Sequence, residues 1–159
     1  MAWDYLASHA TIHDIMNDSG LAKLGDSLVN LCFSLAKSVV IGCPTGEKVK
    51  DSVLARAIRS SPIYASIGHR TDPGSAADAY EAVMAWLWLN RKTTIDSVVD
   101  SLTKSLLAED MEREKSAKRN DESAVRAFQS LLEQVSKQLP ICGYTQQDGQ
   151  DESYPVSKP

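Results

Sequence analysis

Apolar residues recur every three or four positions along most of the chain, which is the spacing of one face of an α-helix. The longest segment with this pattern runs from 20 to 41 and is typical of a buried helix. The same spacing and the cap residues predict further helices at 3–16, 47–59, 73–90, 94–111 and 121–139. No strand-like alternation or internal repeat stands out. We therefore expect an all-α fold, a helical bundle.

Turn residues mark where these helices begin and end. Asp72 suits the cap before a helix, and Pro73 suits its first position. Pro140 ends the last helix, and the residues after it are rich in Gln, Asp, Gly and Pro, so we expect 140–159 to be a disordered tail. The charged run 109–119 is expected to protrude into solvent. The 159 residues then contain one domain, over 1–139.

A single carboxylate stands in the middle of the apolar segment 20–41. Asp26 falls on the narrow polar line of this segment, and Asn30 lies one turn further along the same face. A lone ionised group on a buried helix costs several kcal/mol unless it is paired or binds a metal, so Asp26 requires a partner. Gly25 costs the helix about 1 kcal/mol relative to alanine. This cost suggests that something packs close against the backbone there.

The best partner is an acidic pair about fifty residues further on. Asp78 and Glu81 are three positions apart on a predicted helix, so both side chains project from one face. Small and apolar neighbours indicate that this helix is buried, and two carboxylates so close together favour a shared cation. If Asp26 meets the pair, three carboxylates converge on a hard ion such as Mg²⁺. Such a site suits a metal-assisted phosphodiesterase.

The composition narrows the function classes. The net charge of −4 argues against a protein that coats nucleic acid by charge alone, without excluding a local basic face. The segment 47–59 offers such a face, since its basic residues lie opposite its apolar ones. The three cysteines are an odd number without metal-type spacing, so neither a disulfide framework nor a zinc site is indicated.

The same patterns indicate where the protein resides. The best apolar run, 28–41, is interrupted by Lys37 and is too short to cross a bilayer. The first residues lack the basic start and apolar block of a signal peptide. We therefore expect a cytoplasmic protein with no membrane contact.

Three segments, in order, resemble the ribonuclease III family. Residues 24–30, LGDSLVN, resemble the signature helix of that family, and residues 77–85, ADAYEAVMA, resemble its second acidic helix. Between them, residues 51–59, DSVLARAIR, are similar to its linking helix. Order and approximate spacing agree over roughly 21–90.

The resemblance implies an all-α endonuclease domain that forms a homodimer and hydrolyses double-stranded or structured RNA with Mg²⁺ or Mn²⁺. Asp26, Asp78 and Glu81 match three of the four acidic positions of the family, as catalytic residues and metal ligands. The fourth position, normally a Glu one turn before the signature Asp, falls on Ala22. The compact Mini ribonuclease III branch also tolerates a non-acidic residue there, so activity is still expected. The number of bound metals is left open.

Other residues are expected to support the site or to contact RNA. Asn30 is placed to support Asp26, and Asp51 offers a further oxygen. About twenty residues follow the last predicted helix, so we expect the catalytic domain itself to contact the duplex rather than a separate RNA-binding domain. The candidate phosphate contacts are Lys48, Lys50, Arg56, Arg59 and Arg70, with His69, Arg91 and Lys92 as further candidates.

Two other functions stay open. An all-α, Mg²⁺-dependent nucleotide pyrophosphohydrolase also sets acidic pairs on helices, but it usually has two pairs, where this chain adds only Asp26. A catalytically inactive relative of ribonuclease III that binds RNA or serves a structural role is favoured by Ala22 and opposed by the three retained acids. The letters GDSL at 25–28 also name a lipase family with Ser27 as nucleophile. That reading needs a strand before Ser27 and a late Asp-x-x-His, and no His follows His69.

Overall fold

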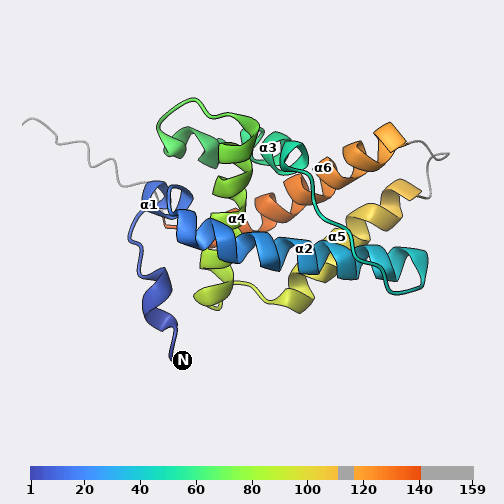
Figure 1. Cartoon of the computed structure of the whole chain (residues 1–159), viewed down its shortest axis with the longest axis horizontal. Helices are drawn as coiled ribbons and strands as arrows, with labels where there is room; N and C mark the ends of the chain where they lie inside the picture. Colours follow the sequence, from blue (N-terminus) through green and yellow to red (C-terminus); the bar gives the residue numbers. More distant parts are fainter. Residues whose placement is uncertain (111–116, 141–159) are drawn as a thin grey trace, which may run out of the picture.

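The chain folds into helices around one long buried helix (Figure 1). The computed structural model describes residues 1–110 and 117–140, and these contain no strand, which confirms the all-α prediction. In order, the elements are η1 (Asp4–Ala7), α1 (Ile12–Met16), α2 (Ser19–Ile41), α3 (Asp51–Arg59), η2 (Pro62–Ile67), α4 (Pro73–Leu89), α5 (Ile95–Asp110), α6 (Ala117–Val135) and η3 (Ser136–Gln138). The expected tail after residue 140 and most of the charged run 109–119 lie outside the described residues.

The central helix is α4. Of its 17 residues 12 are buried, as expected of a helix that is apolar on every side. Helices α1, α2 and α3 all pack against it, and α2 crosses it in Figure 1. On the side of α4 that faces α6, the Tyr80 hydroxyl donates a hydrogen bond to the Phe128 carbonyl at 2.7 Å. The acidic pair predicted on this segment therefore lies in the middle of the core.

Helices α2 and α4 touch through their backbones at Gly25. A Cβ atom added to Gly25 would overlap the main-chain carbonyl of Glu81, so only glycine permits this approach. The alanines of α4 help in the same way, because Ala77 and Ala82 are buried and small. The close contact expected at Gly25 is confirmed, and it brings the helix of Asp26 directly against Glu81.

The caps at the helix starts also follow the sequence. Asp72 accepts a hydrogen bond from the Ser75 amide at 2.7 Å, and Pro73 takes the first position of α4, as predicted. Asp18 caps α2 by accepting a hydrogen bond from the Leu21 amide at 2.9 Å. At the other end of α2, Gly42 has φ of 79° and ends the helix in the left-handed conformation.

Helix α3 begins at Asp51, four residues later than predicted. The preceding segment instead runs along α2 and is held there by polar side chains of that helix. Ser34 exchanges two hydrogen bonds with the Glu47 backbone at 2.9 and 3.1 Å. The Val49 amide donates to Asn30 Oδ1 at 2.8 Å. Because these contacts satisfy the backbone of the segment, it has no need to form another helical turn.

The outer face of α2 is apolar and exposed. A row of four large side chains at helical spacing remains 41 to 59% exposed: Leu24, Leu31, Leu35 and Val39. Among the described residues, α2 is long and apolar enough to cross a membrane by length and composition alone, so the expectation that no run reaches that length was wrong. The opposite face of α2 packs on α4 and α5. We name the exposed row the α2 apolar stripe.

Candidate active site

The site is built where α2 crosses α4, and its centre is the pair Asp26 and Glu81. Glu81 is only 6% exposed, and its carboxyl lies near that of Asp26. Burial is the largest cause that raises the pKa of Glu81, to about 8, and repulsion by Asp26, Asp78 and Asp51 raises it further. Near neutral pH, without a cation, Glu81 therefore holds a proton.

Asp78 and Asp51 border this pair. The pKa of Asp78 is raised, first by partial burial and then by the charges of Asp51, Asp72 and Asp26. None of the causes that shift Asp78 or Glu81 is a basic group. Four acidic side chains from α2, α3 and α4 therefore lie near one another, and in the part of the chain that the structure describes no basic group contributes to these pKa shifts, which is an environment that favours a bound cation.

The donor set has the chemistry that a hard divalent ion prefers. Carboxylate oxygens are the ligands that Mg²⁺ and Mn²⁺ prefer, and both ions readily keep water molecules in the remaining positions. Among the described residues, however, no three side chains of Asp, Glu, His or Cys already lie close enough to hold one ion. The residues that could hold such an ion are Asp26, Asp78 and Glu81.

Asn30 ties this centre to the start of α3. Its amide nitrogen donates to Asp26 Oδ1 at 3.0 Å, while its amide oxygen accepts from the Val49 backbone at 2.8 Å. One side chain therefore orients Asp26 and also fixes the segment that leads to Asp51. The pattern predicts the first contact, because the two residues are one turn apart. It could not reveal the second, since that contact joins segments far apart in the sequence.

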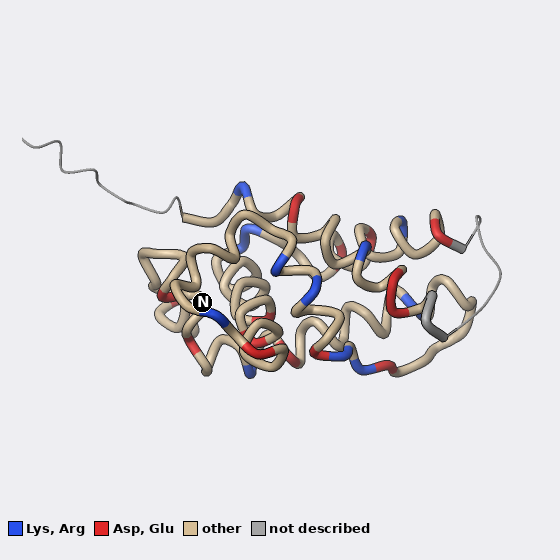
Figure 2. Tube along the Cα trace, turned by 90° about the horizontal axis from the view of Figure 1, so that it is seen from above, with Lys and Arg blue, Asp and Glu red and all other residues tan. Residues whose placement is uncertain are grey.

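Some of the predicted RNA-contacting residues already have partners within the fold, and others form no ion pair among the described residues. Lys50 pairs with Asp121 and Arg56 with Glu122, each at 2.9 Å, so α6 offsets part of the basic face of α3. Arg59 donates to the Thr71 carbonyl at 2.8 Å and holds the loop before α4. Within the described residues Lys48 and Arg70 form no ion pair. In Figure 2 basic and acidic residues are interspersed along the molecule.

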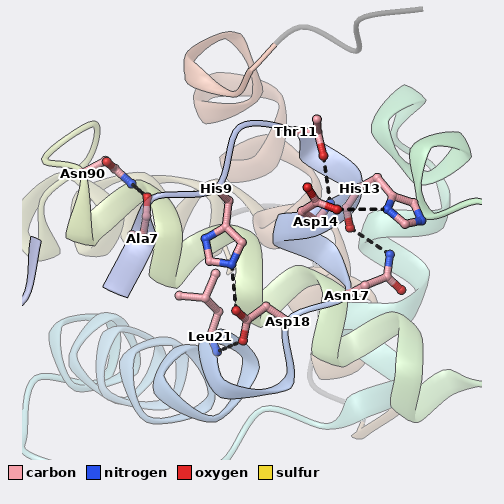
Figure 3. A network of polar contacts seen from close by, with 9 residues as sticks. All are labelled: Ala7, His9, Thr11, His13, Asp14, Asn17, Asp18, Leu21 and Asn90. Carbon is pink, nitrogen blue, oxygen red and sulfur yellow. Dashed lines mark hydrogen bonds and ion pairs between the residues drawn. The ribbon is translucent and has the colours of Figure 1, made fainter. Parts of the chain in front are cut away.

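A polar network near the N-terminus was missed in the sequence. His9 Nε2 lies 2.7 Å from Asp18 Oδ2, while Asp18 Oδ1 caps α2 (Figure 3). Asn90, at the end of α4, donates to the Ala7 carbonyl at 3.2 Å (Figure 3). These contacts join the first residues to α2 and α4. The cap signal at Asp18 was visible in the sequence, but its pairing with His9 depends on the fold.

Ala22 lies on the same side of α2 as the site and is 5% exposed. It lines an open cavity of about 170 Å³ together with Asp78, between the beginnings of α2 and α4. No carboxylate is supplied from position 22, so the described site contains three acids on α2 and α4, with Asp51 on α3 as the fourth nearby.

One comparison with known proteins finds a family for this chain, and another finds no match. A search of curated protein sequences gave no match. The sequence model of the family described as Ribonuclease III matches residues 19–141, which include α2, α3 and α4 with Asp26, Asp51, Asp78 and Glu81. The match spans most of the chain. The chain therefore belongs to the ribonuclease III family.

Proposed function

We propose that the protein is a metal-dependent endoribonuclease that hydrolyses phosphodiester bonds in double-stranded or structured RNA, with Asp26, Asp78 and Glu81 as its catalytic residues and metal ligands. The observation that carries the proposal is the Asp26–Glu81 pair, held at the α2–α4 backbone contact with no basic partner. A structural ion-pair network would place a Lys or Arg there. Membership of the family supports RNA-directed chemistry, and the acidic side chains at the α2–α4 contact support the choice of residues.

Each group then has a stated part in the chemistry. Asp26, Asp78 and Glu81 hold Mg²⁺ or Mn²⁺, which when bound activates water and offsets charge on the leaving oxygen. Asn30 keeps Asp26 turned toward Glu81. Burial and then the neighbouring carboxylates raise the pKa of Glu81, so an ion held by Glu81 would bind in competition with its proton. Asp51 is held at the start of α3 as a supporting oxygen.

RNA contacts and a second copy complete the proposal. Lys48 and Arg70 contact backbone phosphates, and Lys50, Arg56 and Arg59 can join if they exchange their present partners for phosphates. A second copy of the chain covers the α2 apolar stripe, since a row of exposed large side chains suits a homodimer contact. The expected setting is the cytoplasm.

The test is cleavage of an end-labelled RNA duplex with Mg²⁺, with Mn²⁺ and with no divalent ion. We expect Glu81→Gln to lose at least about a hundredfold in rate, because it removes a metal ligand and a charge without changing shape. The matched control is Glu133→Gln on α6, an exposed acid far along the chain from the site, which keeps the rate.

The alternatives give different results in the same assay. RNA that is bound but left intact by the unaltered protein, with every ion, would identify an inactive relative. Release of pyrophosphate from a nucleoside triphosphate, with the duplex untouched, would identify a nucleotide pyrophosphohydrolase instead.

A further inference from the structure

We infer that Tyr64 is a positioning residue for RNA binding, because its hydroxyl holds the loop that carries Arg70 beside the candidate site. The inference rests on the proposed function, since it explains how one of the proposed phosphate contacts is kept in place. The loop runs from 68 to 72, between η2 and α4.

This loop borders the carboxylate site. His69 lines the open cavity that Asp78 also lines. The pKa of Asp78 is raised first by partial burial and then by nearby charges, which include that of Asp72 at the end of the loop. Arg70 lies between His69 and Asp72, is exposed, and forms no ion pair within the described residues. An RNA strand whose phosphate lies at the carboxylates therefore passes close to the loop that carries this cation.

Side chains, and not main-chain contacts, hold the middle of the loop. Its ends are fixed, because Gly68 ends η2 with φ of 82° and Asp72 caps α4. Between them, residues 69–71 form no hydrogen bond from main chain to main chain in the part of the chain that the structure describes. Such a segment keeps its conformational freedom unless side chains restrict it.

Thr71 is the point at which the loop is held. It is 9% exposed, and its hydroxyl lies 2.8 Å from the Tyr64 hydroxyl. Arg59 donates a hydrogen bond to its carbonyl, also at 2.8 Å. The contact with the Thr71 hydroxyl is the main cause that lowers the pKa of Tyr64, and Arg59 lowers it further. Tyr64 thus fixes the residue next to Arg70 from η2, while Arg59 fixes it from α3.

The expected consequence is for RNA binding and not for the chemical step. A loop that is already ordered does not have to be ordered when RNA binds, so loss of a hydrogen bond that holds it adds a cost to binding. One neutral hydrogen bond corresponds to about a three- to tenfold change in an equilibrium constant. Because Arg70 is still present, the number of phosphates contacted in the complex should stay the same.

The test measures binding of a labelled RNA duplex to the full chain by fluorescence anisotropy, in EDTA and over a series of salt concentrations. We expect Tyr64→Phe to raise Kd about three- to tenfold and to leave the slope of log Kd against log salt unchanged. Arg70→Ala should also raise Kd, but it should reduce the slope by about one, since one phosphate contact is lost. The matched control is Tyr5→Phe, at a tyrosine of η1 that is 74% exposed, which should keep the Kd of the unaltered protein.

A double variant separates positioning from a purely structural role. In a chain that already carries Arg70→Ala, Tyr64→Phe should leave Kd unchanged, because the cation that it positions is absent. Thr71→Val removes the other hydroxyl of the same contact and should reproduce the effect of Tyr64→Phe without adding to it. In single-turnover cleavage with Mg²⁺ and saturating protein, Tyr64→Phe should keep the rate of the unaltered protein.

The outcomes separate this inference from the proposed function. If the duplex is cleaved but Tyr64→Phe leaves Kd unchanged, raises it equally with and without Arg70, or slows cleavage at saturation, the inference is wrong and the nuclease function stands. If the Kd values change as expected but no divalent ion supports cleavage, the positioning role holds and the nuclease proposal fails. If the unaltered protein binds no duplex, both are overturned.

Discussion

At the scale of single residues, the protonation of Glu81 sets the behaviour of the site. A carboxyl whose pKa is higher in the folded than in the unfolded protein binds more protons when folded, so the free energy of unfolding falls as pH rises between the two values. For Glu81 that window runs from its ordinary 4.5 to about 8. Above this window Glu81 is ionised inside the fold without a cation, and the metal-free protein is therefore less stable at alkaline pH than at acidic pH.

The first prediction follows from this sign. In urea unfolding without divalent ions, we expect Glu81→Gln to match the unaltered protein near pH 5 and to exceed its stability by about 1–3 kcal/mol near pH 8.5. Addition of Mg²⁺ at the higher pH should stabilise the unaltered protein far more than the variant. An equal difference at both pH values would show that Glu81 is not protonated in the metal-free fold.

At the scale of elements, α2 organises the site through three different faces. One packs on α4, one carries Asn30 and Ser34 against the segment before α3, and one bears the α2 apolar stripe. Asn30 and Ser34 each make two hydrogen bonds, but only Asn30 also holds a site carboxylate. The two residues therefore separate support of the fold from support of the site.

The second prediction uses them as a matched pair. Asn30→Ala and Ser34→Ala each remove contacts to the same backbone segment and should lose a similar amount of stability, about 1–3 kcal/mol. Only Asn30→Ala should also lower kcat on duplex RNA, by roughly tenfold, because Asp26 loses its donor. Thermal unfolding and single-turnover cleavage measure the two effects. Equal loss of kcat in both variants would make Asn30 a purely structural residue.

The features that could be predicted from the sequence are those that depend on residues close together in the chain. Helical spacing and cap residues predict α2, α4 and the cap at Asp72. Gly25 inside an apolar helix predicts the close backbone contact between α2 and α4. The start of α3 was placed too early, because the extended segment before it is held by side chains of α2 that only the fold brings near. The pairing of Lys50 with Asp121 was hidden for the same reason.

At the scale of the whole molecule, the α2 apolar stripe is a row of large apolar side chains that remains exposed to solvent in a single copy of the chain. Its four residues lie on the helix that also carries Asp26. A contact between two copies along α2 would remove these side chains from water at about 25 cal/mol per Å² of apolar surface. The proposed dimer contact and the candidate site would then lie on one helix.

The third prediction concerns this assembly. The unaltered protein should sediment as a dimer at micromolar concentration, and Leu31→Glu with Leu35→Glu should convert it to a monomer, because two charges would enter the apolar contact. The control is Leu107→Glu, which places a charge on another exposed leucine, on α5, and should leave the dimer intact. Dissociation by the control alone would place the contact on α5 instead.

The backbone contact between Gly25 and Glu81 has a consequence for the choice of ion. Main-chain atoms in contact can neither approach further nor repack, so the distance between α2 and α4 is fixed at this point. Ions of different radius must then be fitted by rotation of the carboxylates alone. If Asp26, Asp78 and Glu81 hold the ion as proposed, discrimination between Mg²⁺, with its strict octahedral shell, and the larger Ca²⁺ would reside in the side-chain torsions of these residues.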